Sequence, residues 1–289
     1  LDGKVYEQNE IEFLPVPAEE AADQLMVAKW IIRNLGMQMG FDVTFAPKIT
    51  AGKAGSGLHI HFKLMDGDTN VMTRDGRLSD EARKAIAGIL EMSPAITAFG
   101  NKVPTSYLRL VPHQEAPTNI CWGDRNRSVL VRVPLGWTGK TDMCAQANPL
   151  EANNIVPPAQ KQTAELRSSD CSADIYQLLA GMVVAARTGF EMPDSLKRAE
   201  DMYVAVNIHN DENKEKLAAL ASLPDSCVAS ADALEQRRAI FEKGNIFSAQ
   251  MIDGIIAQLR GYDDTQLRKQ VNNSSEDMLD LVHKYWHCG

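Results

Sequence analysis

The 289-residue sequence has no apolar run close to the roughly 20 residues that cross a bilayer, and no basic, apolar leader opens it. A membrane or secreted protein is therefore not expected. Cysteine is scarce: there are five, an odd number without a CxxC pair, so neither a disulfide framework nor a zinc site is predicted. We expect reduced thiols in a cytoplasmic protein.

Positive charge is also in deficit. The chain has 30 Lys and Arg against 38 Asp and Glu, a formal net charge of −8, which disfavours a nucleic-acid partner. Apolar residues make up 44% of the chain and charged residues 24%, as in an ordinary globular protein. The first residue is Leu1 and strand-like sequence follows at once, so we expect a fragment of something longer.

Hydrophobic spacing predicts a mixed architecture. Helical periodicity covers 17–39, covers 79–99 with a break expected near Pro94, and returns over most of the chain from residue 174. Within that last part, 175–190 is apolar on nearly every face and is expected to be buried. Alternating sequence predicts strands at 9–14, 43–47 and 58–64, and short strands with long loops between 107 and 167. Hairpin-like spacing of these strands indicates an α+β domain with an antiparallel sheet.

Two imidazoles lie on the polar face of the 58–64 strand. His59, His61 and Lys63 alternate with four apolar residues, so they share one face. An isolated His-x-His pair is more often incidental than a ligand set. Gly55 and Gly57 just before it favour a ligand, because glycine lets the backbone approach another group closely.

Carboxylates lie on two other predicted strands. Glu10 and Glu12 share one face of the first, and Glu165 and Arg167 share one face of another. Acid pairs on strands are commonly just solvated. If these faces converge on His59, the oxygen-rich site would suit Mg²⁺ or Mn²⁺ rather than zinc. Spacing alone leaves that convergence open.

Arginine is concentrated in the stretch from 107 to 134, at positions Arg109, Arg125, Arg127 and Arg132. The planar guanidinium group binds carboxylates and phosphates in bidentate fashion. Structural ion pairs with nearby acids are an equally good interpretation of the cluster. In a regular strand Arg125 and Arg127 would point away from Arg132, so a shared anion requires a turn or bulge after Arg127.

Four motifs in this order resemble the glutamine synthetase family. They read GSGLHIH at 55–61, RLVPHQEAP at 109–117, RNRSVLVRVP at 125–134 and ELRSSD at 165–170. The resemblance extends over essentially the whole chain. It implies a curved antiparallel sheet with a helical C-terminal part. We expect residues 1–289 to form a partial catalytic domain, with 174–289 mostly helical and packed on the sheet.

The resemblance also implies roles for individual residues. Ligands of Mg²⁺ or Mn²⁺ would be Glu10, His59 and Glu165, with Asp2 where the family has glutamate. Glutamate would be bound by Arg109, Arg167 and Gly55, and the nucleotide phosphates by His61 and Arg132. Arg127 and Arg132 would face the transferred phosphoryl group, and Glu115 would close over the site on a flap and take a proton from ammonium.

The implied activity is ligation of ammonia to the γ-carboxylate of glutamate. ATP, the co-substrate, would phosphorylate the carboxylate, and ammonia would displace phosphate. The family implies a cytoplasmic homo-oligomer of stacked rings with no membrane or nucleic-acid partner. The family's N-terminal β-grasp domain and a Glu-x-Glu strand are missing from the sequence, so the 289 residues alone are expected to be inactive.

Two alternatives stay open. One is a γ-glutamyl ligase acting on an amine other than ammonia, and the other is a non-catalytic relative. Retention of Arg109, Arg167 and Glu115 favours glutamate as substrate, and intact Glu10, His59 and Glu165 weigh against a protein without turnover.

Overall fold

The computed structural model describes residues 5–50, 53–112, 114, 116–134, 150, 161–205, 219–271 and 275–289. Its helices are α1 Ala18–Gln38, α2 Asp80–Gly100, α3 Pro104–Arg109, α5 Ile175–Glu191, α6 Ser195–Asp201, α8 Cys227–Glu242, α9 Ala249–Arg260, α10 Leu267–Val271 and α11 Ser275–Lys284, with a 3₁₀ turn, η3, at Lys243–Asn245. Its strands are β1 Ile60–Phe62, β2 Met65–Asp66, β3 Thr69–Asn70, β4 Thr73–Arg74, β5 Arg77–Leu78, β6 Trp122–Asp124, β7 Val131–Val133 and β8 Ala164–Leu166. The predicted α+β class is confirmed.

A four-stranded sheet with the order β1-β8-β7-β6 is central to the fold. β8 pairs antiparallel with both β1 and β7, as expected. β6 and β7 run parallel instead. The chain leaves β6 through Arg125, whose φ of 56° is in the left-handed region, and residues 125–130 form the loop to β7.

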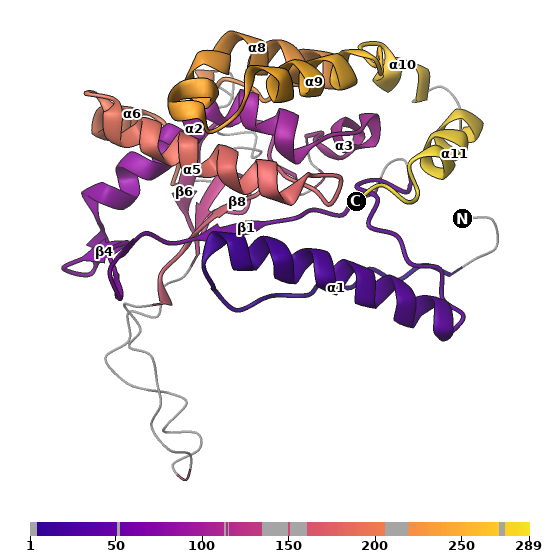
Figure 1. Cartoon of the computed structure of the whole chain (residues 1–289), viewed down its shortest axis with the longest axis horizontal. Helices are drawn as coiled ribbons and strands as arrows, with labels where there is room; N and C mark the ends of the chain where they lie inside the picture. The colour runs from indigo at the N-terminus through magenta and orange to yellow at the C-terminus, as the bar shows by residue number, and fades with distance from the viewer. Residues whose placement is uncertain are drawn as a thin grey trace.

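One face of this sheet is apolar and belongs to the main core. Leu166, Ala164 and Val131 are fully buried there with residues of α2, α5 and α8. In Figure 1, α8 and α9 form the outer layer at the top, α2 and α5 lie between them and the strands, and α1 lies on the opposite side. The other face of the sheet is left for polar side chains, because residues alternate along each strand.

Helices α2 and α5 approach each other through glycine. A β-carbon on Gly88 would lie 2.1 Å from the carbonyl oxygen of Ala185, and one on Gly189 would lie 1.9 Å from that of Lys84. No larger residue fits either position without moving a backbone. This close crossing buries most of α2.

The break expected near Pro94 is wrong, because α2 is continuous across it. Proline has no N–H to donate to the carbonyl of Leu90 one turn earlier. The hydroxyl of Ser93 donates to that carbonyl instead, at 2.7 Å, so the acceptor is satisfied inside the core. The helix therefore passes the proline.

Two predicted strands do not form. Residues 9–14 and 43–47 have no strand structure, and Ile11, Phe13 and Leu14 are exposed. A strand needs a neighbour to pair with, and β1 is the edge of the described sheet. The expectation that 175–190 is buried all round is also too strong, because Tyr176, Val183 and Phe190 of α5 are exposed.

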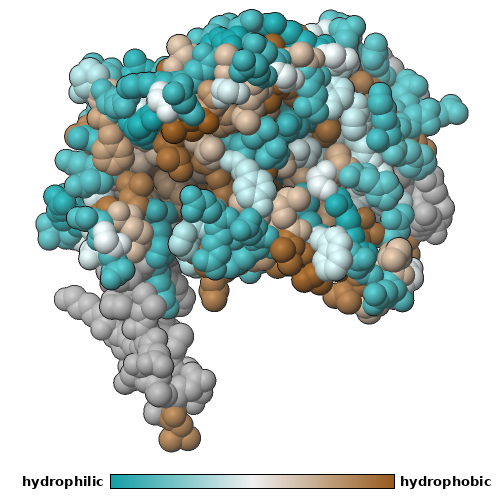
Figure 2. Space-filling model, viewed as in Figure 1, coloured by the Kyte–Doolittle hydropathy of each residue, from teal (hydrophilic) through white to brown (hydrophobic). Residues whose placement is uncertain are grey.

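Helix α1 covers the predicted span but buries little. Only Ala22, Lys29 and Gly36 are buried, while Val27 and Trp30 are 56% and 66% exposed. Figure 2 shows apolar residues along the lower part of this face, where Figure 1 places α1. Within the described residues, none of the helices has the length and apolarity that crossing a membrane requires.

Candidate functional site

The polar face of the sheet centres on Glu165 in β8. The strand register places it directly opposite His61 of β1 and Arg132 of β7. Cross-strand partners point to the same face, and the alternation adds His59 and Arg167 to it. The sheet thus brings together residues that are more than 100 positions apart in the chain.

Short distances join these side chains. The carboxylate of Glu165 is completely buried, and its Oε2 lies 2.6 Å from Nη2 of Arg132. Its Oε1 lies 3.0 Å from Nδ1 of His59 and 3.4 Å from Nε of Arg167, and Nε2 of His61 is 3.9 Å from Oε2. His59 lies within hydrogen-bonding distance of the carboxylate, and the guanidinium groups of Arg132 and Arg167 add charge attraction.

Burial and charge act in opposite directions on this group. Burial alone would raise the pKa of Glu165, but His59, Arg132 and His61 together lower it below its ordinary value. Burial lowers the pKa of His61, against the pull of Glu165 and Glu12. At neutral pH the cluster therefore holds an ionised carboxylate beside a neutral His61.

A second buried cation, Arg109, lies beneath the glycine-rich segment 53–57. Its guanidinium donates to the carbonyls of Ser168, at 2.7 Å, and Arg167, at 3.2 Å. Burial lowers the pKa of Arg109, partly opposed by Asp170. Both of these acceptors are neutral backbone carbonyls, so no carboxylate accepts a hydrogen bond from Arg109 within the described residues.

The glycines were expected to allow a close approach, and the group approached is Arg109. A β-carbon on Gly57 would lie 2.3 Å from Nη2 of Arg109, and one on Gly55 would lie 2.9 Å from its Cγ and 2.2 Å from the carbonyl oxygen of Pro47. Glycine is therefore required for the segment to lie on the guanidinium.

The remaining arginines of the cluster lie in the loop between β6 and β7. Arg125 and Arg127 have exposed side chains and line a shallow hollow with Asp124, Asn126, Ser128 and Ala205. The backbone carbonyl of Arg127 accepts a hydrogen bond from Arg167, which connects this loop to the polar face. In a regular strand Arg125 and Arg127 would point away from Arg132. Residues 125–130 form a loop instead, so the strand alternation does not separate these side chains from Arg132.

One predicted metal ligand is not joined to the cluster, and two further predicted residues lie outside the described part of the chain. Glu10 is exposed and, within the described residues, makes no hydrogen bond or ion pair with it. Asp2 and Glu115 lie outside the described residues. Glu12, two residues after Glu10, is the carboxylate of this segment whose negative charge raises the pKa of His61.

The cluster offers part of a cation site. His59 Nδ1 and Glu165 Oε1 are 3.0 Å apart. Two atoms on adjacent positions of an octahedral ion, each about 2.1 Å from it, are also roughly 3 Å apart, so this pair fits Mg²⁺ or Mn²⁺. In the described part of the chain, no three His, Cys, Asp or Glu side chains form a group that could hold a metal. The site needs further ligands.

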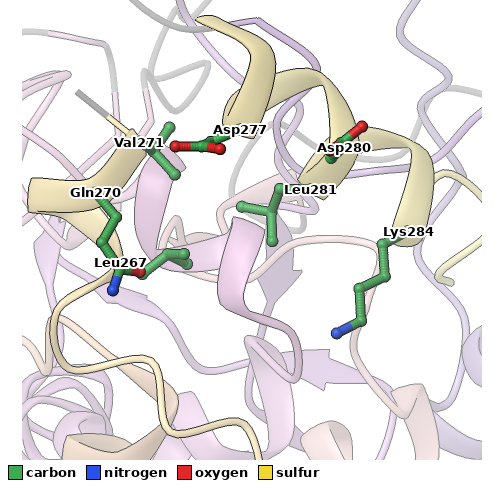
Figure 3. A pocket seen from close by; sticks show the side chains of 7 residues that line it. All are labelled: Leu267, Gln270, Val271, Asp277, Asp280, Leu281 and Lys284. Carbon is green, nitrogen blue, oxygen red and sulfur yellow. The ribbon is translucent and has the colours of Figure 1, made fainter. Parts of the chain in front are cut away.

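Sequence reasoning missed one polar residue next to this site. Lys48 is almost fully buried near Arg109, yet it is a single lysine after a proline and belongs to no periodic pattern. A different hollow, between α10 and α11 in Figure 3, contains none of the predicted residues; it is lined by Leu267, Gln270, Val271, Asp277, Asp280, Leu281 and Lys284.

Comparison with known proteins decides the family. The family model of the glutamine synthetase catalytic domain matches residues 4–278. The chain belongs to the glutamine synthetase family. It is 34% identical to a glutamine synthetase of Frankia alni over 241 residues and 35% identical to one of Mycolicibacterium smegmatis over 243 residues. These alignments cover 81% and 83% of this chain but 45% and 46% of the relatives, so the chain spans about half their length.

Solved structures agree on the fold. A Plasmodium falciparum glutamine synthetase superposes with a TM-score of 0.65 at 22% identity, covering 87% of this chain and 52% of that one. A crystal structure described as a novel glutamine synthase homolog superposes with a TM-score of 0.63 at 22% identity and covers 91% of this chain. The synthetase-family fold with its helical C-terminal part is therefore established for this chain.

Proposed function

We propose that the whole protein ligates ammonia to the γ-carboxylate of glutamate, using ATP and passing through γ-glutamyl phosphate. The observation that carries this proposal is the buried Glu165, which contacts His59, Arg132 and Arg167 on one sheet face, with Arg109 buried close by. A carboxylate is a poor electrophile, so it must be activated, and activation by phosphate transfer requires cations around the reacting anions.

Glutamate binding is assigned to the two buried arginines. Arg109, with neutral acceptors on one side and Gly55 packed against it, would bind one substrate carboxylate. Arg167 would contribute next to it. Since both guanidinium groups are held by backbone carbonyls, little ordering is needed when the substrate binds.

Phosphate chemistry is assigned to the next side chains along the same face. Arg132 in β7 and Arg127 in the preceding loop would stabilise charge on the transferred phosphoryl group, and His61 would contact nucleotide phosphate. Magnesium or manganese, bound by His59 and Glu165 with further ligands, would neutralise phosphate charge. The roles of Glu10, Asp2 and Glu115 rest on the motif match alone.

An isotope experiment tests the reaction. The full-length protein is supplied with ATP, Mg²⁺, ammonia and glutamate labelled with ¹⁸O in its γ-carboxylate. If γ-glutamyl phosphate forms and ammonia displaces phosphate, one ¹⁸O atom is expected in each phosphate released. Mass spectrometry of phosphate and of glutamine measures both products.

A panel of amines is run in parallel. Unlabelled phosphate would contradict the acyl-phosphate route, and phosphate release that requires another amine and ignores ammonia would contradict ammonia as substrate. Arg127→Ala is expected to reduce turnover by at least about 100-fold, because a donor to transition-state charge is lost. Assembly into stacked rings and a cytoplasmic location stay predictions.

A further inference from the structure

Lys48 lies where two segments of the proposed glutamate site meet. Its side chain is 3% exposed, and its ammonium group donates to the backbone carbonyl of Lys53 and to Oε1 of Gln114, the latter at 2.5 Å. Lys53 opens the glycine-rich segment 53–57, and Gln114 lies within the 109–117 motif. One ammonium group thus contacts both segments.

These segments both touch Arg109. The backbone N–H of Ser56 donates to the carbonyl of Pro47 at 2.9 Å, which closes the loop on which Lys48 lies. Gly55 and Gly57 then pack on the Arg109 side chain. Arg109 itself begins the 109–117 motif, so the Lys48 ammonium group connects the segment that packs on Arg109 to the segment that carries it.

Stability does not explain a lysine at this position. Burial, together with the nearby charge of Arg109, lowers the pKa of Lys48 to about 8. Both acceptors are neutral oxygens. A methionine of similar length would avoid the cost of burying the charge.

We propose that Lys48 is a positioning residue that ties the glycine-rich segment to the 109–117 motif and so keeps Arg109 enclosed for glutamate. The kinetic part of this inference rests on the proposed function. The structural part does not, because the connection is present in the chain whatever it binds.

Hydrogen exchange of the full-length protein, followed by mass spectrometry, tests the connection directly. In Lys48→Met we expect amide exchange to become about tenfold faster or more in peptides covering 53–57 and 108–118, with exchange in β8 unchanged. Lys29→Met is the matched control: Lys29 is 5% exposed and donates to the carbonyl of Cys171, at 3.1 Å, a residue that belongs to neither segment.

Gln114 supplies a second pair of variants. Gln114→Leu removes the acceptor and should loosen the same peptides, whereas Gln114→Glu keeps an acceptor for the ammonium group and should preserve their protection. In kinetic assays Lys48→Met and Gln114→Leu should raise the KM for glutamate about tenfold with a smaller change in kcat and in the KM for ATP. Lys29→Met should leave these constants unchanged.

Unchanged exchange of both segments in Lys48→Met would overturn the proposal, as would equal effects of Lys48→Met and Lys29→Met. Faster exchange in only one segment would also overturn it, because the proposed connection holds both segments. If the exchange pattern appears but no glutamine is formed by the unmodified protein, the tie stands and the proposed function fails.

Discussion

Glu165 is the residue on which the electrostatics of the site depend. It is fully buried on a three-residue strand, and Arg132, Arg167 and His59 all lie within 3.4 Å of its oxygens. Burying a carboxylate is costly unless cations surround it. Removing its charge therefore affects both the substrate side of the sheet and the fold.

Glu165→Gln keeps the shape of the side chain and removes the charge. We expect the free energy of unfolding at pH 7 to fall by about 3 kcal/mol, since buried cations lose their counter-charge. Because the native pKa lies below the ordinary 4.5, the stabilisation is present above that value and is lost as the pH falls below it. Urea unfolding at pH 7 and in acid should show the two proteins converging in acid.

Glu191→Gln is the control for that measurement. Glu191 pairs with Lys243 at 2.8 Å on the surface, where water screens the interaction. We expect little change in the urea midpoint. A loss in Glu165→Gln no larger than in this control would show that the buried carboxylate is not the centre of the charge cluster.

Lys48 gives a second prediction of pH dependence, in the alkaline range. Its native pKa of about 8 is below the ordinary 10.5, so the unfolded chain binds more protons between these values and stability rises with pH there. Below pH 8 the full penalty of about 3 kcal/mol is present. Lys48→Met lacks this ionisable group, so the free energy of unfolding of the unmodified protein should rise relative to that of the variant from pH 8 to 10.5. If the difference in the free energy of unfolding between the two proteins stays constant from pH 8 to 10.5, the lowered pKa of Lys48 is wrong.

At the scale of elements, hydrophobic spacing predicts where a helix lies in the sequence but not which other helix it packs against. The helices α1 and α2 follow their predicted spans closely, since apolar residues at three- and four-residue steps are sufficient for an amphipathic helix. The contact between α2 and α5 depends instead on two glycines that have no distinctive pattern in the sequence. Their role is visible only when both helices are in place.

Gly88→Ala is expected to destabilise the protein by at least about 2 kcal/mol, because the added methyl group would overlap the backbone of α5. Gly254→Ala in α9 is the matched control: a β-carbon there meets nothing within 4 Å. This second change should stabilise by about 0.5–1 kcal/mol through helix propensity. Thermal unfolding compares the two, and equal shifts of the same sign would refute tight packing at Gly88.

At the scale of the whole molecule, the apolar face of α1 is the main unpaired surface feature. Met26, Val27, Trp30 and Leu35 are all exposed on this one helix. A contiguous apolar surface of this kind normally contacts other protein. The part of the chain described here leaves this face open to another molecule.

We expect the 289-residue chain to self-associate through this face. Its mass in sedimentation equilibrium should rise with concentration above 31.8 kDa. The double variant Val27→Lys, Trp30→Lys should stay near that mass, because charge on the face opposes association. Gln236→Lys, an added charge at an exposed position of α8, should behave like the unmodified chain. Association that persists in the double variant would exclude the α1 face.

The sequence by itself determined what depends on neighbours along the chain. Spacing predicted the helices, alternation placed His59 and His61 on one strand face, and the motifs around Arg109 and Glu165 indicated the family, now established. Spacing failed at residues 9–14 and at Pro94, where the outcome depended on a missing strand partner and on the Ser93 hydroxyl.

Only the tertiary structure decided which side chains meet. Register across three strands sets Glu165 between His61 and Arg132, and nothing local to any one strand specifies that register. The burial of Lys48 and the glycine crossing of α2 and α5 are likewise contacts between distant segments. The local pattern of apolar residues determines whether a segment is helix or strand, whereas packing of the whole chain determines which other segments it contacts.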